Sequence, residues 1–201
     1  MVDEVHYWYH IPGYIANDAI ENRVDKVLDI GCGYGTLLYF AKEKYSAECY
    51  GIDIYDNLKG LVDELDINFK LSNIELNDFP FDETFDRIIF TEILEHLHCC
   101  PIKTLRTLHD KLNDGGKLFL STPAASVAQG WGWGRIMDYR RHLGDFKMEC
   151  LPDNIEAEHI YQYEESELLY IFDKSGFAVE KIAIHQPPHW GSHFNFQLIK
   201  V

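Results

Sequence analysis

Three glycines spaced two residues apart constrain the fold of this chain more than any other feature. They are Gly31, Gly33 and Gly35, and they directly follow four mostly apolar residues, 27–30, at the end of a predicted strand at 24–30. Such a segment is typical of a buried strand, and glycines without Cβ atoms let the following turn bring backbone amides close to a ligand. Residues 35–44 have the pattern of a helix. The sequence therefore predicts a strand–turn–helix unit with a ligand site at the turn.

Two acidic residues flank this predicted turn. Asp29 stands two residues before the first glycine, and Asp53 ends a second predicted strand at residues 47–53. A carboxylate at the end of the second strand is suited to bind the two hydroxyls of a ribose. The glycine spacing is G-x-G-x-G, not the dinucleotide spacing G-x-G-x-x-G. Because the charge of Asp29 would repel a pyrophosphate and attract a positively charged ligand, a nicotinamide dinucleotide is disfavoured.

Strands and helices are predicted to alternate along the chain, which favours a mostly parallel sheet with right-handed crossovers. The last two predicted strands are joined by a short turn at residues 187–188 and should be antiparallel. A second turn is predicted at residues 113–116, where Asn-Asp-Gly-Gly occurs. We expect helices at 15–20, 56–65, 101–112 and 164–175, and further strands at 68–71, 85–90, 117–121, 177–184 and 193–201.

The net charge and the distribution of apolar residues indicate which kinds of molecule the protein can bind. The chain has 201 residues, enough for one domain, and its 33 acidic and 18 basic residues give a net charge of −15. The electrostatic field of this net negative charge repels a phosphate backbone, which disfavours nucleic acid as a partner. No signal peptide and no apolar run of membrane-spanning length occur, and the five cysteines include no C-x-x-C pair. We expect a cytoplasmic monomer or homodimer without a membrane span.

Four segments resemble motifs of the class I S-adenosylmethionine-dependent methyltransferases, over roughly residues 20–185. They are D-I-G-C-G-Y-G at 29–35, T-E-I-L-E-H-L at 91–97, L-N-D-G-G-K-L-F-L-S-T-P at 112–123, and the run from 159 to 177. The ubiquinone-biosynthesis O-methyltransferases and the small-RNA 2′-O-methyltransferases are the most similar groups. The resemblance implies an α/β fold: a Rossmann-like, doubly wound seven-stranded sheet of order 3-2-1-4-5-7-6, strand 7 antiparallel, with helices on both faces.

The resemblance also implies which residues bind S-adenosylmethionine. They are Asp29, Gly31, Cys32, Gly33, Gly35, Asp53, Ile54, Asn73, Ile74 and Thr91. The glycine turn would line the methionine end, with Asp29 near its ammonium group, and Asp53 would hold the ribose. Asn73 stands where the family usually has an aspartate that contacts the adenine amino group. An amide oxygen can accept the same hydrogen bond.

Glu92, Glu95 and His96 form the sharpest local pattern. At positions i, i+3 and i+4 of a helical turn, all three side chains could point one way, and carboxylates with an imidazole suit a hard divalent ion such as Mg²⁺. In the small-RNA enzymes the same E-x-x-E-H pattern binds a metal together with a later histidine, a position that His159 fits. Two alternatives stay open. His96 or His159, with Glu92, could form a metal-free catalytic pocket, or the pattern could be structural.

Two further segments are candidates for covering the site. Residues 122–160 show no sustained period and contain Trp131 and Trp133 among glycines, which predicts a substrate-side insertion or lid. His142 in this segment is another candidate base. Residues 1–22 are expected to form an N-terminal helix preceded by an aromatic flap over the cofactor.

Three functions remain as hypotheses. The first is methyl transfer from S-adenosylmethionine to a hydroxyl of a small molecule, such as a phenol, a sugar or a secondary metabolite. The absence of an N/D-P-P-Y/F tetrapeptide after the fourth strand argues against methylation of amino groups of DNA bases or glutamine. The second is a metal-dependent 2′-O-methyltransferase acting on RNA, which the negative charge disfavours. The third is a non-catalytic protein that binds S-adenosylmethionine for regulation.

Overall fold

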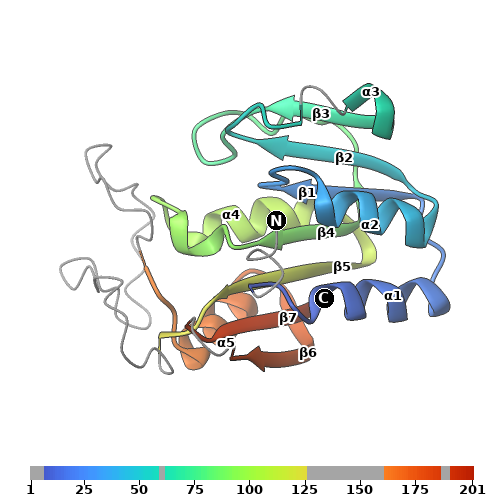
Figure 1. Ribbon diagram of the computed structural model, residues 1–201. Coiled ribbons are helices and arrows are strands. Elements are labelled where there is room, and N and C mark those ends of the chain that lie inside the picture. Colours follow the sequence, from blue (N-terminus) through green and yellow to red (C-terminus); the bar gives the residue numbers. More distant parts are fainter. Residues whose placement is uncertain (1–6, 59–61, 126–160, 187–190) are drawn as a thin grey trace.

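The computed structural model describes residues 7–58, 62–125, 161–186 and 191–201. Within them, one sheet has the order β3-β2-β1-β4-β5-β7-β6 (Figure 1). Its strands are β1 (Lys26–Ile30), β2 (Glu48–Asp53), β3 (Ile67–Leu71), β4 (Phe85–Thr91), β5 (Leu112–Pro123), β6 (Phe177–His185) and β7 (His193–Lys200). The helices are α1 (Ile11–Glu21), α2 (Thr36–Tyr45), α3 (Val62–Leu65), the 3-10 turn η2 (Leu94–His96), α4 (Pro101–Lys111) and α5 (Glu165–Lys174).

The topology confirms the predicted fold class. Strands β1 to β5 pair in parallel, and β7 runs antiparallel to both β5 and β6. The carboxyl ends of β1, β2 and β4 therefore meet at one edge of the sheet, where ligands bind in such folds. This edge carries the predicted glycine turn.

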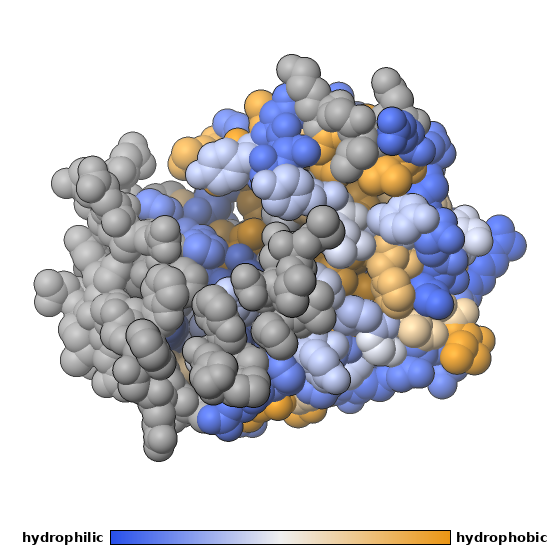
Figure 2. Space-filling model, in the orientation of Figure 1, coloured by the Kyte–Doolittle hydropathy of each residue, from blue (hydrophilic) through white to orange (hydrophobic). Residues whose placement is uncertain are grey.

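Both faces of the sheet are covered, which explains the nearly continuous apolar character of its central strands. Val27 and Ile89 belong to the apolar cluster formed with α1 and α2. Their neighbours Leu28 and Ile88 belong to the cluster formed with α4 and α5. Figure 1 shows α1 and α2 in front of the sheet and α4 and α5 behind it. Figure 2 shows hydrophilic and hydrophobic residues intermixed over the described part of the front.

The N-terminal helix is longer than the predicted range 15–20. It begins at Ile11 because Pro12 fits the first turn, where a backbone N–H has no helical partner. The preceding residues pack on the start of β7: the His10 N–H donates to Asn195 Oδ1 at 3.1 Å, and Asn195 Nδ2 donates to the Tyr7 carbonyl at 3.2 Å. The described part of this segment, Tyr7 to His10, thus lies against β6 and β7, and its expected role as a flap over the cofactor stays a prediction.

Three predicted boundaries differ from the structure. Strand β5 begins at Leu112 and runs through the predicted turn at 113–116, where Gly115 has φ +72° and the pairing with β4 shifts register. Of the predicted helix 56–65, only Val62–Leu65 is helical within the described residues. The segment 122–160 was predicted as an insertion, but its first two residues, Thr122 and Pro123, still belong to β5 and pair with β7.

Several sequence hypotheses fall on residues outside the described ranges. Residues 126–160 are among these, so Trp131, Trp133, His142 and His159 lie outside what the structure describes. Among the described helices, none is both long enough and apolar enough to cross a membrane. Cys32, Cys49 and Cys100 are buried free thiols.

Candidate functional site

The glycine turn adopts backbone conformations that favour glycine. Gly31, Gly33 and Gly35 have φ values of +71°, +52° and +75°. A Cβ atom on Gly31 would lie 2.1 Å from Cδ1 of Ile93, whereas a Cβ on Gly33 would meet no atom within 4 Å. A side chain at the first glycine would therefore have to displace Ile93, in addition to the strain of its positive φ. The second borders open space and lines a cavity.

This cavity has a volume of about 660 Å³, which is in the range of small-molecule sites. It lies at the carboxyl ends of β1, β2 and β4. Of the predicted site residues, those lining it are Gly31, Gly33, Asp53, Ile54, Asn73, Ile74, Glu92 and His96. Those not lining it are Asp29, Cys32, Gly35, Thr91 and Glu95. Tyr34, which lies within the glycine turn, also lines it, as do Tyr55 and His98, and all three were missed. Nothing in the local sequence of Tyr55 and His98 distinguishes them from ordinary loop residues.

Asp53 connects the second strand to the glycine turn. Its Oδ2 accepts a hydrogen bond from the Gly33 N–H at 2.8 Å, and its Oδ1 accepts one from the Tyr55 N–H at 2.8 Å. Each oxygen keeps a further lone pair, so the carboxylate is oriented by the backbone and can still accept hydrogen bonds from a diol. This arrangement fits the ribose-binding role implied by the resemblance.

Asp29 is placed behind the cavity wall. It is only 2% exposed, and its Oδ1 has no hydrogen-bond partner among the described residues. Burial, and then the neighbouring charge of Asp53, raise the pKa of Asp29 well above its usual range. A cationic ligand in the cavity would favour the ionised form of this carboxyl, because an opposite charge nearby lowers the pKa of an acid. Its contact with an ammonium group stays a prediction.

Asn73 and Glu75 shape the far side of the cavity. Asn73 Oδ1 accepts a hydrogen bond from the Glu75 N–H at 2.9 Å, which leaves one lone pair of that oxygen for an adenine amino group. The carboxylate of Glu75 accepts the N–H groups of His98 at 2.9 Å and Cys99 at 2.8 Å. The segment after β3 is thereby tied to the segment before α4. Sequence reasoning missed Glu75, since its partners are backbone amides distant in the chain.

Glu92 follows β4 in a strained conformation, with φ +55°. Its side-chain Oε1 accepts a hydrogen bond from the Ser121 hydroxyl at 2.6 Å, and its N–H donates to the Ser121 carbonyl at 3.0 Å. Its Oε2 lies 3.0 Å from Nδ1 of His193, the first residue of β7. Burial raises the pKa of Glu92 to about 8. His193 was missed because only the folded sheet brings β7 beside β5.

Glu95 and His96 differ in burial. Glu95 is fully buried, and its Oε2 accepts a hydrogen bond from the Thr122 hydroxyl at 3.0 Å. Burial, and then the charge of Glu92, raise the pKa of Glu95 well above its usual range. The His96 side chain is 43% exposed and its Nε2 lies 3.7 Å from Glu95 Oε1, beyond hydrogen-bonding distance.

The predicted convergence of Glu92, Glu95 and His96 on one metal ion is not found. Among the described ranges, no group of three or more His, Cys, Asp or Glu side chains is arranged to hold a metal. The expected helical turn is a short 3-10 turn beginning at Leu94, and Ser121 and Thr122 each take one of the two carboxylates. The described donor set does not fit a metal, and the fourth predicted ligand, His159, lies outside it.

Most of the chain matches a known protein family. A family model described as a methyltransferase domain matches residues 8–182. The chain belongs to the methyltransferase domain family. Its sheet order and antiparallel final strand are those of class I S-adenosylmethionine-dependent methyltransferases, as the motif resemblance implied.

Similar proteins within this family differ in what they methylate. A sphingolipid C9-methyltransferase of Komagataella phaffii is 31% identical over 134 residues, which are 56% of this chain and 27% of that protein. A ubiquinone biosynthesis O-methyltransferase of Xanthomonas oryzae is 32% identical over 117 residues, 52% of this chain and 47% of that protein. The chain thus spans between about a quarter and a half of these relatives.

A solved structure is similar over nearly the whole chain. The N-methyltransferase NodS from Bradyrhizobium japonicum, crystallised with S-adenosylhomocysteine, has a TM-score of 0.67 and 14% identity, covering 99% of this chain and 90% of that one. At this identity the likeness concerns the fold alone. The family itself is shown by the match to the methyltransferase domain over residues 8–182.

Proposed function

We propose that this protein binds S-adenosylmethionine in the cavity at the glycine turn and transfers its methyl group to a hydroxyl of a small molecule. The observation that carries the proposal is the anchored carboxylate of Asp53, which faces the open space at Gly33. Bound S-adenosylmethionine supplies a methyl group already activated on a sulfonium. The protein's task is therefore to align an acceptor and to remove its proton.

The residues of the cavity fit each part of this donor. Gly33 leaves room for the methionine moiety, Asp53 offers acceptors to the ribose, and Asn73 offers one lone pair to the adenine amino group. Ile54 and Ile74 add apolar lining. Together these residues match the ribose and the adenine of one nucleoside. The nearby carboxyl groups suit the positive charges of the donor's sulfonium and ammonium groups.

A hydroxyl acceptor is favoured by the polar cluster of Glu92, Ser121 and His193, because methyl transfer to a hydroxyl needs a proton acceptor. The names of the relatives point to different acceptors, so this choice rests on that cluster. The RNA alternative has less support. It needs a basic surface, which the net charge of −15 opposes, and a metal group that the described residues do not form.

Binding is tested by isothermal titration calorimetry with S-adenosylhomocysteine and, separately, with NAD. We expect the first to bind and the second not to. Asp53→Ala should weaken S-adenosylhomocysteine binding by about 1–3 kcal/mol, the scale of a hydrogen bond to a charged group. Asp82→Ala is the matched control, since Asp82 is exposed and does not line the cavity. Binding of NAD alone would overturn the proposal.

Transfer is tested with S-adenosylmethionine carrying a deuterated methyl group. The protein is incubated with panels of phenols, sugars and primary amines, and the labelled products are fragmented to find which atom carries the methyl. We expect oxygen-linked label, with full activity in excess chelator. Label on nitrogen would refute the hydroxyl assignment. Tight donor binding with no transfer to any panel would favour the regulatory alternative.

A further inference from the structure

We propose that Glu92 makes the β4 end of the cavity favour ligands that place a positive charge there. This inference rests on the proposed function and deepens it, because it names the charge of the acceptor. The protein prefers acceptors that carry an ammonium group near the reacting hydroxyl, then uncharged acceptors, and disfavours acceptors that carry a carboxylate. The comparisons assign no such role to Glu92, and the motif suggested metal binding or catalysis instead.

The position of Glu92 in the fold places it beside the part of the cavity proposed for the donor. Along the edge of the sheet, Asn73 follows β3, Asp53 ends β2, and the glycine turn follows β1. The proposed function assigns the adenine, the ribose and the methionine moiety to these places in that order. Glu92 follows β4, which is the next strand in the sheet, and it also lines the cavity. It therefore lies on the side of the methionine moiety that is left for the acceptor.

The described wall of the cavity carries acidic groups without lysine or arginine. Asp53, Glu75 and Glu92 line it, and no lysine or arginine is among the described residues that do. Asp53 and Glu75 each accept two backbone N–H groups, and such donors stabilise a carboxylate. Glu92 accepts a hydrogen bond from the neutral Ser121 hydroxyl, at 2.6 Å. Its negative charge is therefore the one in this wall that a ligand is best placed to balance.

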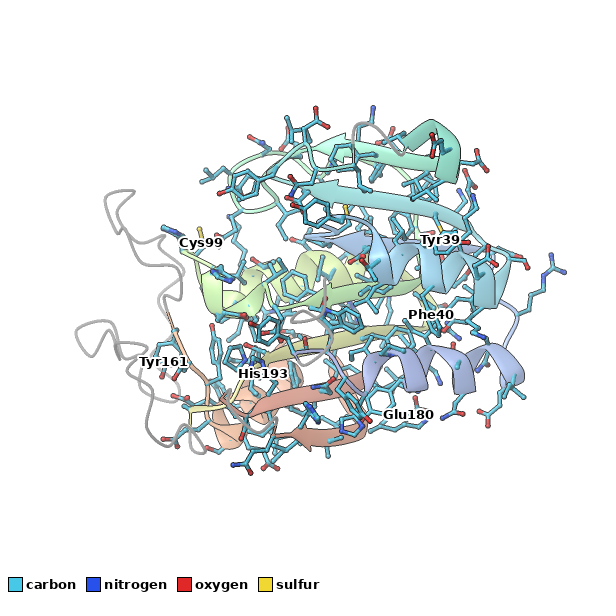
Figure 3. All side chains as sticks on the ribbon, in the orientation of Figure 1. Tyr39, Phe40, Cys99, Tyr161, Glu180 and His193 are labelled. Carbon is cyan, nitrogen blue, oxygen red and sulfur yellow. The ribbon has the colours of Figure 1, made fainter. Side chains whose placement is uncertain are left out.

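His193, the first residue of β7, adds no positive charge beside Glu92 near pH 7. Its Nδ1 lies 3.0 Å from Glu92 Oε2, but burial lowers the pKa of the ring to about 4 and so keeps it neutral. The charge of Glu95 opposes this shift without cancelling it. Figure 3 shows His193 toward the same end of the sheet as Cys99, with Tyr39 of α2 toward the other end. Glu92 thus meets an uncharged ring on this side.

Glu95 adds a second acid next to Glu92, although it does not itself line the cavity. It is fully buried, and its Oε1 has no hydrogen-bond partner among the described residues. Burial, and then the charge of Glu92, raise the pKa of Glu95 well above its usual range, and burial raises the pKa of Glu92 to about 8. A positive charge in the cavity would favour the ionised forms of both carboxyls, because an opposite charge nearby lowers the pKa of an acid. The two acids together therefore favour a cationic ligand.

Asp18 shows how this chain balances a buried carboxylate that has a structural role. It is only 2% exposed, and it forms ion pairs with Arg87 Nε at 2.6 Å and with Lys117 Nζ at 3.1 Å. The Glu92 side chain is 19% exposed, and within the described residues it forms an ion pair with neither a lysine nor an arginine. Because a carboxylate so far removed from water is costly without a cationic partner, a ligand that supplies the positive charge gains affinity at Glu92.

The charges of the proposed donor and of its product support this role. S-adenosylmethionine carries a sulfonium, an ammonium and one carboxylate, and methyl transfer leaves an uncharged thioether in place of the sulfonium. Asp29 is the group predicted for the ammonium, so the sulfonium is the donor charge left for Glu92. An acceptor carboxylate at this place would add a like charge, which is unfavourable in a poorly solvated site. An acceptor ammonium group would supply the opposite charge.

The first test needs no acceptor. Calorimetry compares S-adenosylhomocysteine with sinefungin, in which a carbon bearing an amino group replaces the sulfur, so that an ammonium stands where the donor carries its methyl group. At pH 8, well above the pKa of about 6.5 of a histidine in water, we expect sinefungin to bind about 10- to 100-fold more tightly, the range of a hydrogen bond to a charged group. Glu92→Gln keeps an acceptor for the Ser121 hydroxyl and should remove most of this advantage. Equal affinities in the wild type, or an advantage unchanged in Glu92→Gln, would overturn the proposal.

The second test compares acceptors that differ only in charge. Dopamine, 4-methylcatechol and 3,4-dihydroxybenzoate share two phenolic hydroxyls, and glucosamine, glucose and glucuronate form the matching sugar series. At pH 7 we expect kcat/KM to fall in the order ammonium, neutral, carboxylate within whichever series is methylated. Glu92→Gln should narrow the difference between the first and last members by about tenfold or more, again the range of one charged hydrogen bond. A preference for the carboxylate members would contradict the proposal. If neither series is methylated, the calorimetry decides alone.

Two controls separate a local effect of Glu92 from the field of the whole protein. Asp82→Asn removes the same unit of charge from an exposed position that does not line the cavity, and should leave the preference for sinefungin unchanged. The preference should also persist in about 1 M salt, which screens long-range fields far more than contacts in a buried site. Loss of the preference in salt would assign it to the net charge and refute the role of Glu92. If the wild type binds neither compound, the proposed function itself fails, whereas equal binding of both defeats only the present inference.

Discussion

Arg87 on β4 forms a buried, two-point ion pair with Asp18 on α1. Arg87 Nε donates to Asp18 Oδ2 at 2.6 Å, and Nη2 donates to Oδ1 at 3.2 Å. Lys117 of β5 places its Nζ 3.1 Å from Oδ1, and the Tyr45 hydroxyl of α2 donates to Oδ2 at 2.9 Å. One carboxylate thus ties the N-terminal helix to two central strands and to the helix that follows the glycine turn.

Removal of this carboxylate should destabilise the fold. Asp18→Ala leaves the buried Arg87 without its carboxylate and Lys117 with Glu180 as its remaining ionic partner, and breaking a buried pair in this way costs about 3–5 kcal/mol. The free energy of unfolding from urea titration measures the loss. Asp25→Ala, which removes an exposed pair with Arg23, is the matched control and should cause little change. Equal stability of Asp18→Ala and wild type would refute the anchoring role.

The same carboxylate predicts a pH dependence of stability. Burial alone would raise the pKa of Asp18, but hydrogen bonds and charge from Arg87, joined by Lys117, outweigh burial and lower it. On acidification the unfolded chain therefore takes up this proton first. The stabilisation is complete above the unfolded pKa of about 4 and is lost as pH falls through the folded pKa. The difference in urea midpoint between wild type and Asp18→Asn should narrow from pH 7 to pH 3. A constant difference would argue against this linkage.

Gly33→Ala should impair ligand binding more than folding. A Cβ there meets no protein atom within 4 Å, so the cost to folding is the strain of positive φ, about 1–2 kcal/mol. The added methyl group would occupy the cavity, and calorimetry should show weaker S-adenosylhomocysteine binding. Gly13→Ala in α1 is the control, since its Cβ also meets nothing and alanine favours helices. Unchanged binding in Gly33→Ala would mean that the ligand does not approach this turn.

Glu75→Ala should loosen the cavity wall. The variant removes the acceptor for the N–H groups of His98 and Cys99, so hydrogen exchange at these two amides should speed up. S-adenosylhomocysteine binding should weaken as well, because Glu75 and His98 both line the cavity. Glu165→Ala, at an exposed position in the first turn of α5, serves as the control. Unaltered exchange would show that the wall is held by other contacts.

Local patterns were sufficient for much of this fold. The glycine spacing, the apolar strand before it and Asp53 after the next strand predicted the turn and one wall of the cavity, and the resemblance supplied the strand order that the structure confirms. These features succeed because each depends on residues close together in the chain. The arrangement of Glu92, Glu95 and His96 depends instead on residues distant in the chain. Their partners, Ser121, Thr122 and His193, come from other strands.

The sequence by itself therefore determined the class of fold and the binding edge, because backbone conformation and apolar periodicity are local properties. Tertiary structure alone decided which polar groups meet. Glu92 and His193, which lie in contact, are 101 positions apart in the chain (193 − 92). Arg87 and Asp18, which form an ion pair, are 69 positions apart. Side-chain pairing across a sheet depends on strand order and register, which no single segment contains.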